Sequence, residues 1–179
     1  MIERMKAISA EKFNQIIKKS KLGPRLKKEL RFGASTSQFS QADWDESELV
    51  AVSTRSGNEG VLLIYSDSKI FIAQYNIIKN ISDKNGRSKP IICAFCSTWG
   101  AGATIGFKKD KNTNVGYLCC SDLRCSDHVR DKTKKSLISR TQLREHLTTQ
   151  ERIERLERNL SGVTKTIQST YVFSEDTDE

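Results

Sequence analysis

Apolar residues near the start of the chain recur at helical spacing. Phe13, Ile16 and Ile17 fall on one face of a helix, and Ser9 stands where a helix-capping residue is expected. Pro24 suits the first turn of a second, shorter helix, because a proline at that position removes no intrahelical hydrogen bond. The N-terminal part of the chain is therefore expected to consist of short helices.

The middle of the chain changes to strand-like patterns. The apolar runs Val61–Tyr65 and Ile70–Ala73 flank a short polar segment, and their β-branched and aromatic residues predict two strands joined by a turn. Farther on, Thr104–Phe107 and Val115–Leu118 predict a second hairpin with a basic, polar turn. Residues 33–41 are rich in Ser, Thr and Gln and are expected to form a loop.

A helical period returns near the C-terminus. Thr148 and Glu151 have the spacing of a capping box, in which each side chain accepts a hydrogen bond from the other's backbone. The apolar residues that follow recur every three or four positions, at Ile153, Leu156, Leu160, Val163 and Ile167. Such an amphipathic helix either packs on its own domain or docks a partner, and we expect the first.

Composition narrows the class of protein. The chain has 179 residues, of which 36% are hydrophobic and 29% charged, as in a globular protein. The longest apolar runs have the length of a strand, far below the roughly 20 residues of a membrane span. The N-terminal residues lack the apolar core of a signal peptide. We therefore expect a cytoplasmic protein with no membrane partner.

The cysteines carry the clearest chemistry. All five lie between Cys93 and Cys125, and an odd number without a secretory signal argues against a disulfide framework. Cys93 and Cys96 form a C-x-x-C pair, a spacing that brings both sulfurs to one tetrahedral ion. A second cluster follows the predicted hairpin. A treble-clef zinc finger has the same order of elements: a tight turn with the first two ligands, a β-hairpin, and then the remaining ligands near the start of a helix.

Three cysteines compete for the second pair of ligands. Cys119 ends a predicted strand and Cys125 opens the next helix, so we choose these two, with Cys120 as the alternative to Cys119. His128 is expected on the helix surface rather than at the metal. A redox C-x-x-C pair and buried thiols without metal are the less favoured interpretations.

Four protein ligands leave no coordination position for a reactive water. The zinc ion, one per chain, is therefore expected to be structural. The chain has only two histidines, no glycine-rich phosphate loop after a strand and no recognisable pair of catalytic carboxylates. We predict a protein that is not an enzyme and has no small-molecule substrate.

These elements predict an α+β fold: a small antiparallel β-sheet region followed by a treble-clef zinc finger, with short N-terminal helices and a C-terminal amphipathic helix. We expect a helical segment over residues 1–42, a β-rich subdomain over 43–82 and the four-cysteine finger with its C-terminal helix over 83–168. Residues 169–179 end in a run of acids and are expected to be a disordered tail.

Positive charge concentrates around the cysteines. The chain carries a formal net charge of +8, and most of it lies between Lys84 and Arg140. Four aromatic residues are interleaved with this charge, at Phe95, Trp99, Phe107 and Tyr117. Basic residues beside flat side chains suit either RNA or an acidic protein surface.

Three segments resemble the C-terminal treble-clef domain of the elongation-factor-G-binding proteins, a family that includes the fusidic-acid-resistance proteins. They are Ile92–Trp99, Gly116–Arg130 and Ser139–Arg144. The resemblance implies a binding platform that engages elongation factor G at the ribosome and aids its release. By position, the zinc cysteines of the family fall on Cys93, Cys96, Cys119 and Cys125.

The resemblance also implies which residues contact the partner. The aromatic residue that precedes the third ligand falls on Tyr117. Asn114 stands where the resistance proteins have a basic residue, and the N-terminal helical part is shorter than theirs, so a housekeeping translation role is expected. We expect the partner surface to include Trp99 and the lysines of the hairpin turn, Lys108, Lys109 and Lys111. The rival hypothesis is direct binding of ribosomal RNA.

Overall fold

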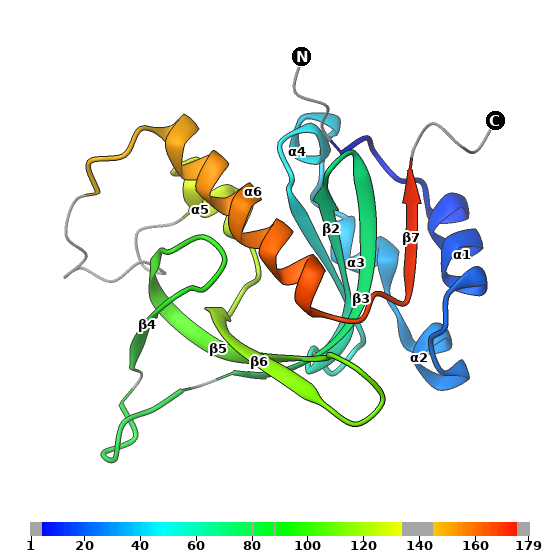
Figure 1. Ribbon diagram of the computed structural model, residues 1–179, viewed down its shortest axis with the longest axis horizontal. Coiled ribbons are helices and arrows are strands. Elements are labelled where there is room, and N and C mark those ends of the chain that lie inside the picture. The colour runs from blue at the N-terminus through cyan, green and yellow to red at the C-terminus, as the bar shows by residue number, and fades with distance from the viewer. Residues whose placement is uncertain (1–4, 80, 88, 134–144, 175–179) are drawn as a thin grey trace.

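The computed structural model describes residues 5–79, 81–87, 89–133 and 145–174 (Figure 1). The helices are α1 (Ala10–Lys19), α2 (Pro24–Glu29), α3 (Phe32–Thr36), α4 (Gln41–Asp45), α5 (Cys125–Val129) and α6 (Thr149–Thr166). The strands are β1 (Leu49–Ser53), β2 (Glu59–Ser66), β3 (Lys69–Lys79), β4 (Pro90–Ile92), β5 (Trp99–Lys108), β6 (Asn114–Cys120) and β7 (Tyr171–Ser174). The family-like segment Ser139–Arg144 and the acids after residue 174 lie outside the described residues.

The described strands form one antiparallel sheet. Its order is β1-β2-β3-β5-β4, with β6 paired to β5 and β7 paired to β3. The long strand β3 has two different neighbours along one edge, because residues 69–72 pair with β7 and residues 75–79 pair with β5. β3 thus connects the N-terminal hairpin to the β5–β6 hairpin.

The apolar run in β2 is explained by a sheet that is covered on both faces. Leu62 and Ile64 point to the core around α6, whereas Val61 and Leu63 point to the core under the N-terminal helices. Side chains alternate along a strand, so a strand with two covered faces reads as continuously apolar. At the tip of the β2–β3 hairpin, Asp67 and Ser68 both have positive φ angles, of 52° and 59°, as in a tight two-residue turn.

The C-terminal helix forms as predicted. Thr148 and Glu151 make the complete capping box at the start of α6. Leu156, Leu160 and Val163 are buried in the larger core together with the cysteine region. Figure 1 shows α6 lying between the β2–β3 hairpin and the β5–β6 hairpin. The helix therefore packs on its own domain and joins the two hairpins.

The N-terminal helices differ in part from the prediction. Ser9 caps α1 and Pro24 opens α2, as expected. Residues 33–41, which were expected to be a loop, contain most of α3 and the start of α4. Aromatic packing explains why so short a helix forms here, since the Phe32 ring lies 4.4 Å from Phe13 and 6.2 Å from Trp44 between ring centroids.

The α+β class is confirmed, although the sheet runs through the expected boundary at residues 82 and 83. β5 follows that boundary and pairs directly with β3, which precedes it. Residues 171–174, expected within the acidic tail, form β7 instead and place Phe173 against the N-terminal core. Pairing with β3 makes this short segment a strand, which its composition does not predict.

Candidate metal centre

The first half of the site is a tight turn between β4 and β5. Cys93 donates its backbone N–H to the carbonyl oxygen of Thr98 at 3.1 Å and accepts one from Ser97 at 2.9 Å. Ser97 has a φ angle of 60°, which allows the chain to reverse immediately after Cys96. The turn brings both thiols to the same side, where each is fully buried.

The second half of the site lies between the end of β6 and the start of α5. Cys120 is the last residue of β6 and Cys125 is the first residue of α5. The loop between them turns at Leu123, whose φ angle is 53° and whose N–H bonds the carbonyl oxygen of Cys120 at 3.1 Å. The Asp122 carboxylate accepts the Arg124 N–H at 3.0 Å and so fixes the loop.

Four sulfurs meet between these halves. The Sγ atoms of Cys93, Cys96, Cys120 and Cys125 all lie within 4.8 Å of one another. The Cys93–Cys125 distance is 3.7 Å and the Cys96–Cys120 distance is 3.4 Å. Sulfurs held about 2.3 Å from a tetrahedral zinc ion are about 3.8 Å apart, whereas a disulfide is far shorter. The cluster is therefore suited to one structural zinc ion.

Hydrogen bonding and burial within the cluster shift the pKa values of the four thiols in two directions, lowering those of Cys93 and Cys96 and raising those of Cys120 and Cys125. The bonds from Cys120 and Cys125 lower the pKa of both Cys93 and Cys96. The pKa of Cys125 rises because its bonding with Cys120 favours the neutral thiol. The thiols of Cys93 and Cys96 thus lose their protons more readily than those of Cys120 and Cys125, and a bound cation would favour the thiolate form of all four.

Cys120 takes the place that the sequence gave to Cys119. These neighbours on β6 pair with Gly102 and Ala103, respectively, and adjacent side chains leave a strand on opposite faces. Cys119 lies in the core face with Ala103, and burial raises its pKa to about 12. The structure thus brings Cys120, and not the predicted Cys119, to the other three thiols, because β6 continues through Cys120 and adjacent side chains leave it on opposite faces.

His128 is buried rather than on the helix surface. Its exposed fraction is only 7%, and its Nδ1 lies 3.1 Å from Sγ of Cys120 while its Nε2 lies 3.0 Å from a carboxylate oxygen of Asp122. Burial lowers the pKa of His128, but the bonds with Asp122 and Cys96 outweigh it and raise the pKa to about 10. The imidazole is thus placed as a donor to the sulfur cluster. The sequence signal for this contact is the presence of Asp122 and His128 close to the last two cysteines.

The geometry agrees with the comparison to known families. A family model described as the FBP C-terminal treble-clef zinc-finger matches residues 27–167. The chain belongs to this family. The matched part begins in α2 and ends after α6, so the family unit contains β1–β3 as well as the finger. No curated protein and no solved structure gives a significant match.

The residues expected to contact a partner do not form one patch on the FBP finger. Lys108, Lys109 and Lys111 are exposed at the β5–β6 turn. Trp99, which is 39% exposed, lies at the opposite end of the ten-residue strand β5, about 30 Å from Lys108 at the usual rise of a strand. Tyr117 is partly buried, and its ring centroid lies 5.9 Å from Phe95 and 6.1 Å from Phe107.

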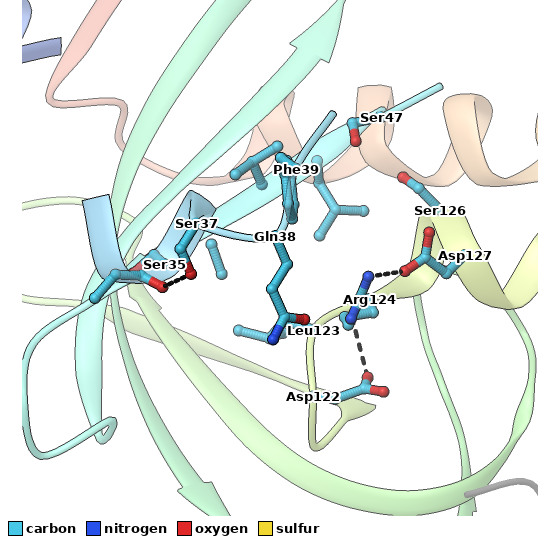
Figure 2. Close-up of a pocket in the computed structure, with 14 residues that line it drawn as sticks. Ser35, Ser37, Gln38, Phe39, Ser47, Asp122, Leu123, Arg124, Ser126 and Asp127 are labelled. Carbon is cyan, nitrogen blue, oxygen red and sulfur yellow. Dashed lines mark hydrogen bonds and ion pairs between the residues drawn. The ribbon is translucent and has the colours of Figure 1, made fainter. Parts of the chain in front are cut away.

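A hollow with a wall of mixed polar and apolar side chains lies beside the FBP finger. It has a volume of about 290 Å³ and lies between the α3–α4 segment and the loop that joins the last two cysteines (Figure 2). The charged groups of its wall are engaged by neighbours, since Arg124 pairs with Asp127 at 2.6 Å and Asp122 contacts His128. None of the described helices combines the length and apolar character needed to cross a lipid bilayer.

Proposed function

We propose that this FBP-family chain is a zinc-dependent binding protein, not an enzyme, that engages translation elongation factor G on or near the ribosome and modulates its release. It would act in the cytoplasm. The observation that carries the proposal is the buried cluster of four thiols, which joins the turn after β4 to the end of the β5–β6 hairpin. A metal at that place makes the hairpin a rigid platform.

The closed ligand set supports binding rather than catalysis. A zinc ion with four sulfur ligands has no open position at which a water could be activated. All four cysteines are 5% exposed or less, so a substrate has no direct route to the ion. The metal therefore contributes to folding and rigidity, as structural zinc does in other small domains.

The distribution of charge supports a protein or ribosomal partner. Basic residues near α5 are neutralised within the chain, because Arg124 pairs with Asp127, Arg130 with Glu48 and Lys132 with Glu46. The lysines of the β5–β6 turn are exposed to solvent instead. Their charge is thus directed outward, to where an acidic partner would meet it.

Binding of purified elongation factor G to zinc-loaded protein tests the proposal. We expect a saturable complex, and we expect Lys109→Glu with Lys111→Glu to weaken it at least fivefold. Lys28→Glu on α2 reverses an equally exposed charge and should bind as the wild type does. Tyr117→Phe keeps the aromatic contacts with the core and asks whether the hydroxyl meets the factor. A folded, zinc-loaded protein that does not bind the factor contradicts the proposal.

A second candidate function is binding of ribosomal RNA. The observation that favours it is the group of exposed basic residues in two connections of the sheet, Lys84, Arg87 and Lys89 before β4 and the lysines of the β5–β6 turn. Contacts of this kind with phosphates produce an affinity that falls steeply with salt. Binding to naked ribosomal RNA that equals binding to the intact ribosome, without elongation factor G, would favour this alternative.

A further inference from the structure

One face of the sheet carries an exposed apolar row. Ile78 on β3 pairs with Thr104 on β5, and Thr104 pairs with Leu118 on β6. Directly paired residues project from the same face of a sheet, so these three side chains stand side by side. Ile78 is 73% exposed and Leu118 is 46% exposed. The row therefore presents two large apolar side chains to solvent, near the C-terminal ends of β3 and β6 and the middle of β5.

The cover of this face ends just before that row. On the same face of β3, Ile70 and Ile72 are buried under the N-terminal helices, and Asn76, farther along, is exposed. The next row consists of Asn76, Gly106 and Gly116, so two of its three positions have no side chain. The side chains of Ile105, Phe107 and Tyr117 leave the opposite face and pack in the core with α6, which lies over the β5–β6 hairpin in Figure 1. We call the exposed face, with Ile78 and Leu118, the bare sheet face.

The bare sheet face ends in positive charge. Lys108 and Asn114 form the row after the glycines, and Lys109 and Lys111 follow in the turn. The acid of that turn, Asp110, accepts the backbone N–H groups of Asn112 and Thr113 at 2.9 and 2.8 Å. Successive rows are about 7 Å apart, so the lysines begin about 14 Å from the apolar row.

We propose that the bare sheet face docks a protein whose contact surface has an apolar centre and an acidic margin. This inference rests on the proposed function, and it assigns the contact with elongation factor G to Ile78, Leu118 and Lys108. Exposed apolar side chains beside a flat backbone gain from an apolar partner surface, and the lysines match carboxylates at its edge.

Other occupants fit the face less well. A second copy of the chain would bring together two molecules that each carry a net charge of +8. Single-stranded RNA stacks its bases on aromatic rings, but the apolar row consists of Ile78, Thr104 and Leu118. A protein surface therefore satisfies both the apolar and the basic part of the face.

The test uses the zinc-loaded full chain, purified elongation factor G and three variants. Ile78→Thr with Leu118→Thr removes the apolar row but keeps residue types that fit a strand. Val172→Thr is the matched control, because Val172 is 43% exposed on β7, away from this face. Lys108→Glu reverses the charge at the basic end. Circular dichroism and zinc content establish that each variant is folded.

We expect the double threonine variant to bind the factor at least tenfold more weakly than the wild type, and Val172→Thr to bind equally well. Lys108→Glu should bind at least fivefold more weakly at low salt, with a smaller difference at high salt. Full affinity in the double variant would overturn the docking face while leaving the proposed function intact. A wild-type chain that does not bind the factor would overturn both. A double variant that loses only RNA binding, or only self-association, would replace the protein partner with RNA or a second copy.

Discussion

His128 lies beside Cys120 at the margin of the metal centre, with its Nδ1 atom 3.1 Å from the sulfur. The other ring nitrogen is held by Asp122, so the imidazole has a fixed orientation. Residues that hydrogen-bond to a metal ligand in this way fix the orientation of the ligand and influence its charge. His128 therefore stabilises the sulfur cluster from outside the set of four ligands.

Replacing His128 with alanine is expected to accelerate zinc loss by 10- to 100-fold. Removing a residue that hydrogen-bonds to a metal ligand typically has an effect of this size. Release to a chromogenic chelator measures the rate. His146→Ala removes the chain's other histidine, which is exposed, and provides the control. Equal rates in the wild type and in His128→Ala would show that the imidazole does not support the metal.

The assignment of the third ligand can be tested by two serine variants. Cys120→Ser should lose zinc and with it much of the finger's stability, because metal binding and folding are coupled. Cys119→Ser should retain one zinc per chain, since Cys119 lies on the opposite face of β6. Metal analysis of both purified proteins decides between them. Retained zinc in Cys120→Ser together with zinc loss in Cys119→Ser would reverse the assignment.

A buried ion pair joins the start of β1 to the end of α5. Arg130 contacts Glu48 through both carboxylate oxygens, at 2.5 and 3.0 Å, and both side chains are less than a tenth exposed. Glu48→Ala leaves a buried charge without its partner and is expected to lower the free energy of unfolding by about 3–5 kcal/mol.

Urea unfolding with saturating zinc measures this change. The double variant Glu48→Leu with Arg130→Met removes both charges and should lose clearly less stability than Glu48→Ala. If the double variant lost as much stability as Glu48→Ala or more, the loss in Glu48→Ala would not come from an unpaired buried charge.

The stability of the fold should also depend on pH through Tyr75. Burial raises the pKa of Tyr75 to about 12. A tyrosine in the unfolded chain titrates near pH 10, so the unfolded state loses its proton first as the pH rises. The stabilisation is therefore complete below pH 10 and is lost between about pH 10 and 12. Its full size is about 3 kcal/mol for a shift of this extent.

Denaturant unfolding at pH 9 and pH 11 provides the measurement. Tyr75→Phe should lose less stability than the wild type over this interval, because it has no phenol to ionise. Tyr171→Phe, which changes a partly buried tyrosine on β7, should behave as the wild type does. An identical pH dependence in Tyr75→Phe and the wild type would contradict the role of this residue.

Local patterns predicted the elements well, because their signals lie close together in the sequence. The capping box of α6, the cap of α1 and both hairpins follow from residues within a few positions of one another. The C-x-x-C turn belongs to the same group. By contrast, pairing of β7 with β3 joins residues about a hundred positions apart, and no local pattern encodes it.

The site could be predicted only to the level of its chemistry. Clustered cysteines indicated zinc, but Cys119 and Cys120 differ only in the face from which they leave β6, and this depends on where the strand ends. The place of His128 could not be predicted for a related reason. Its contacts depend on a loop whose turn is set by Leu123 at a positive φ angle, a conformation that leucine rarely signals.

Because β3 pairs with β7 through its first residues and with β5 through its last, neither hairpin completes its hydrogen bonding without the other part of the chain. A fragment that begins at residue 83 would lack β3 and would leave the backbone hydrogen-bonding groups on that edge of β5 unpaired. We therefore expect that removing the metal with a chelator also destabilises distant parts of the fold such as α1. Thermal unfolding of the chain should then be a single cooperative transition rather than two steps.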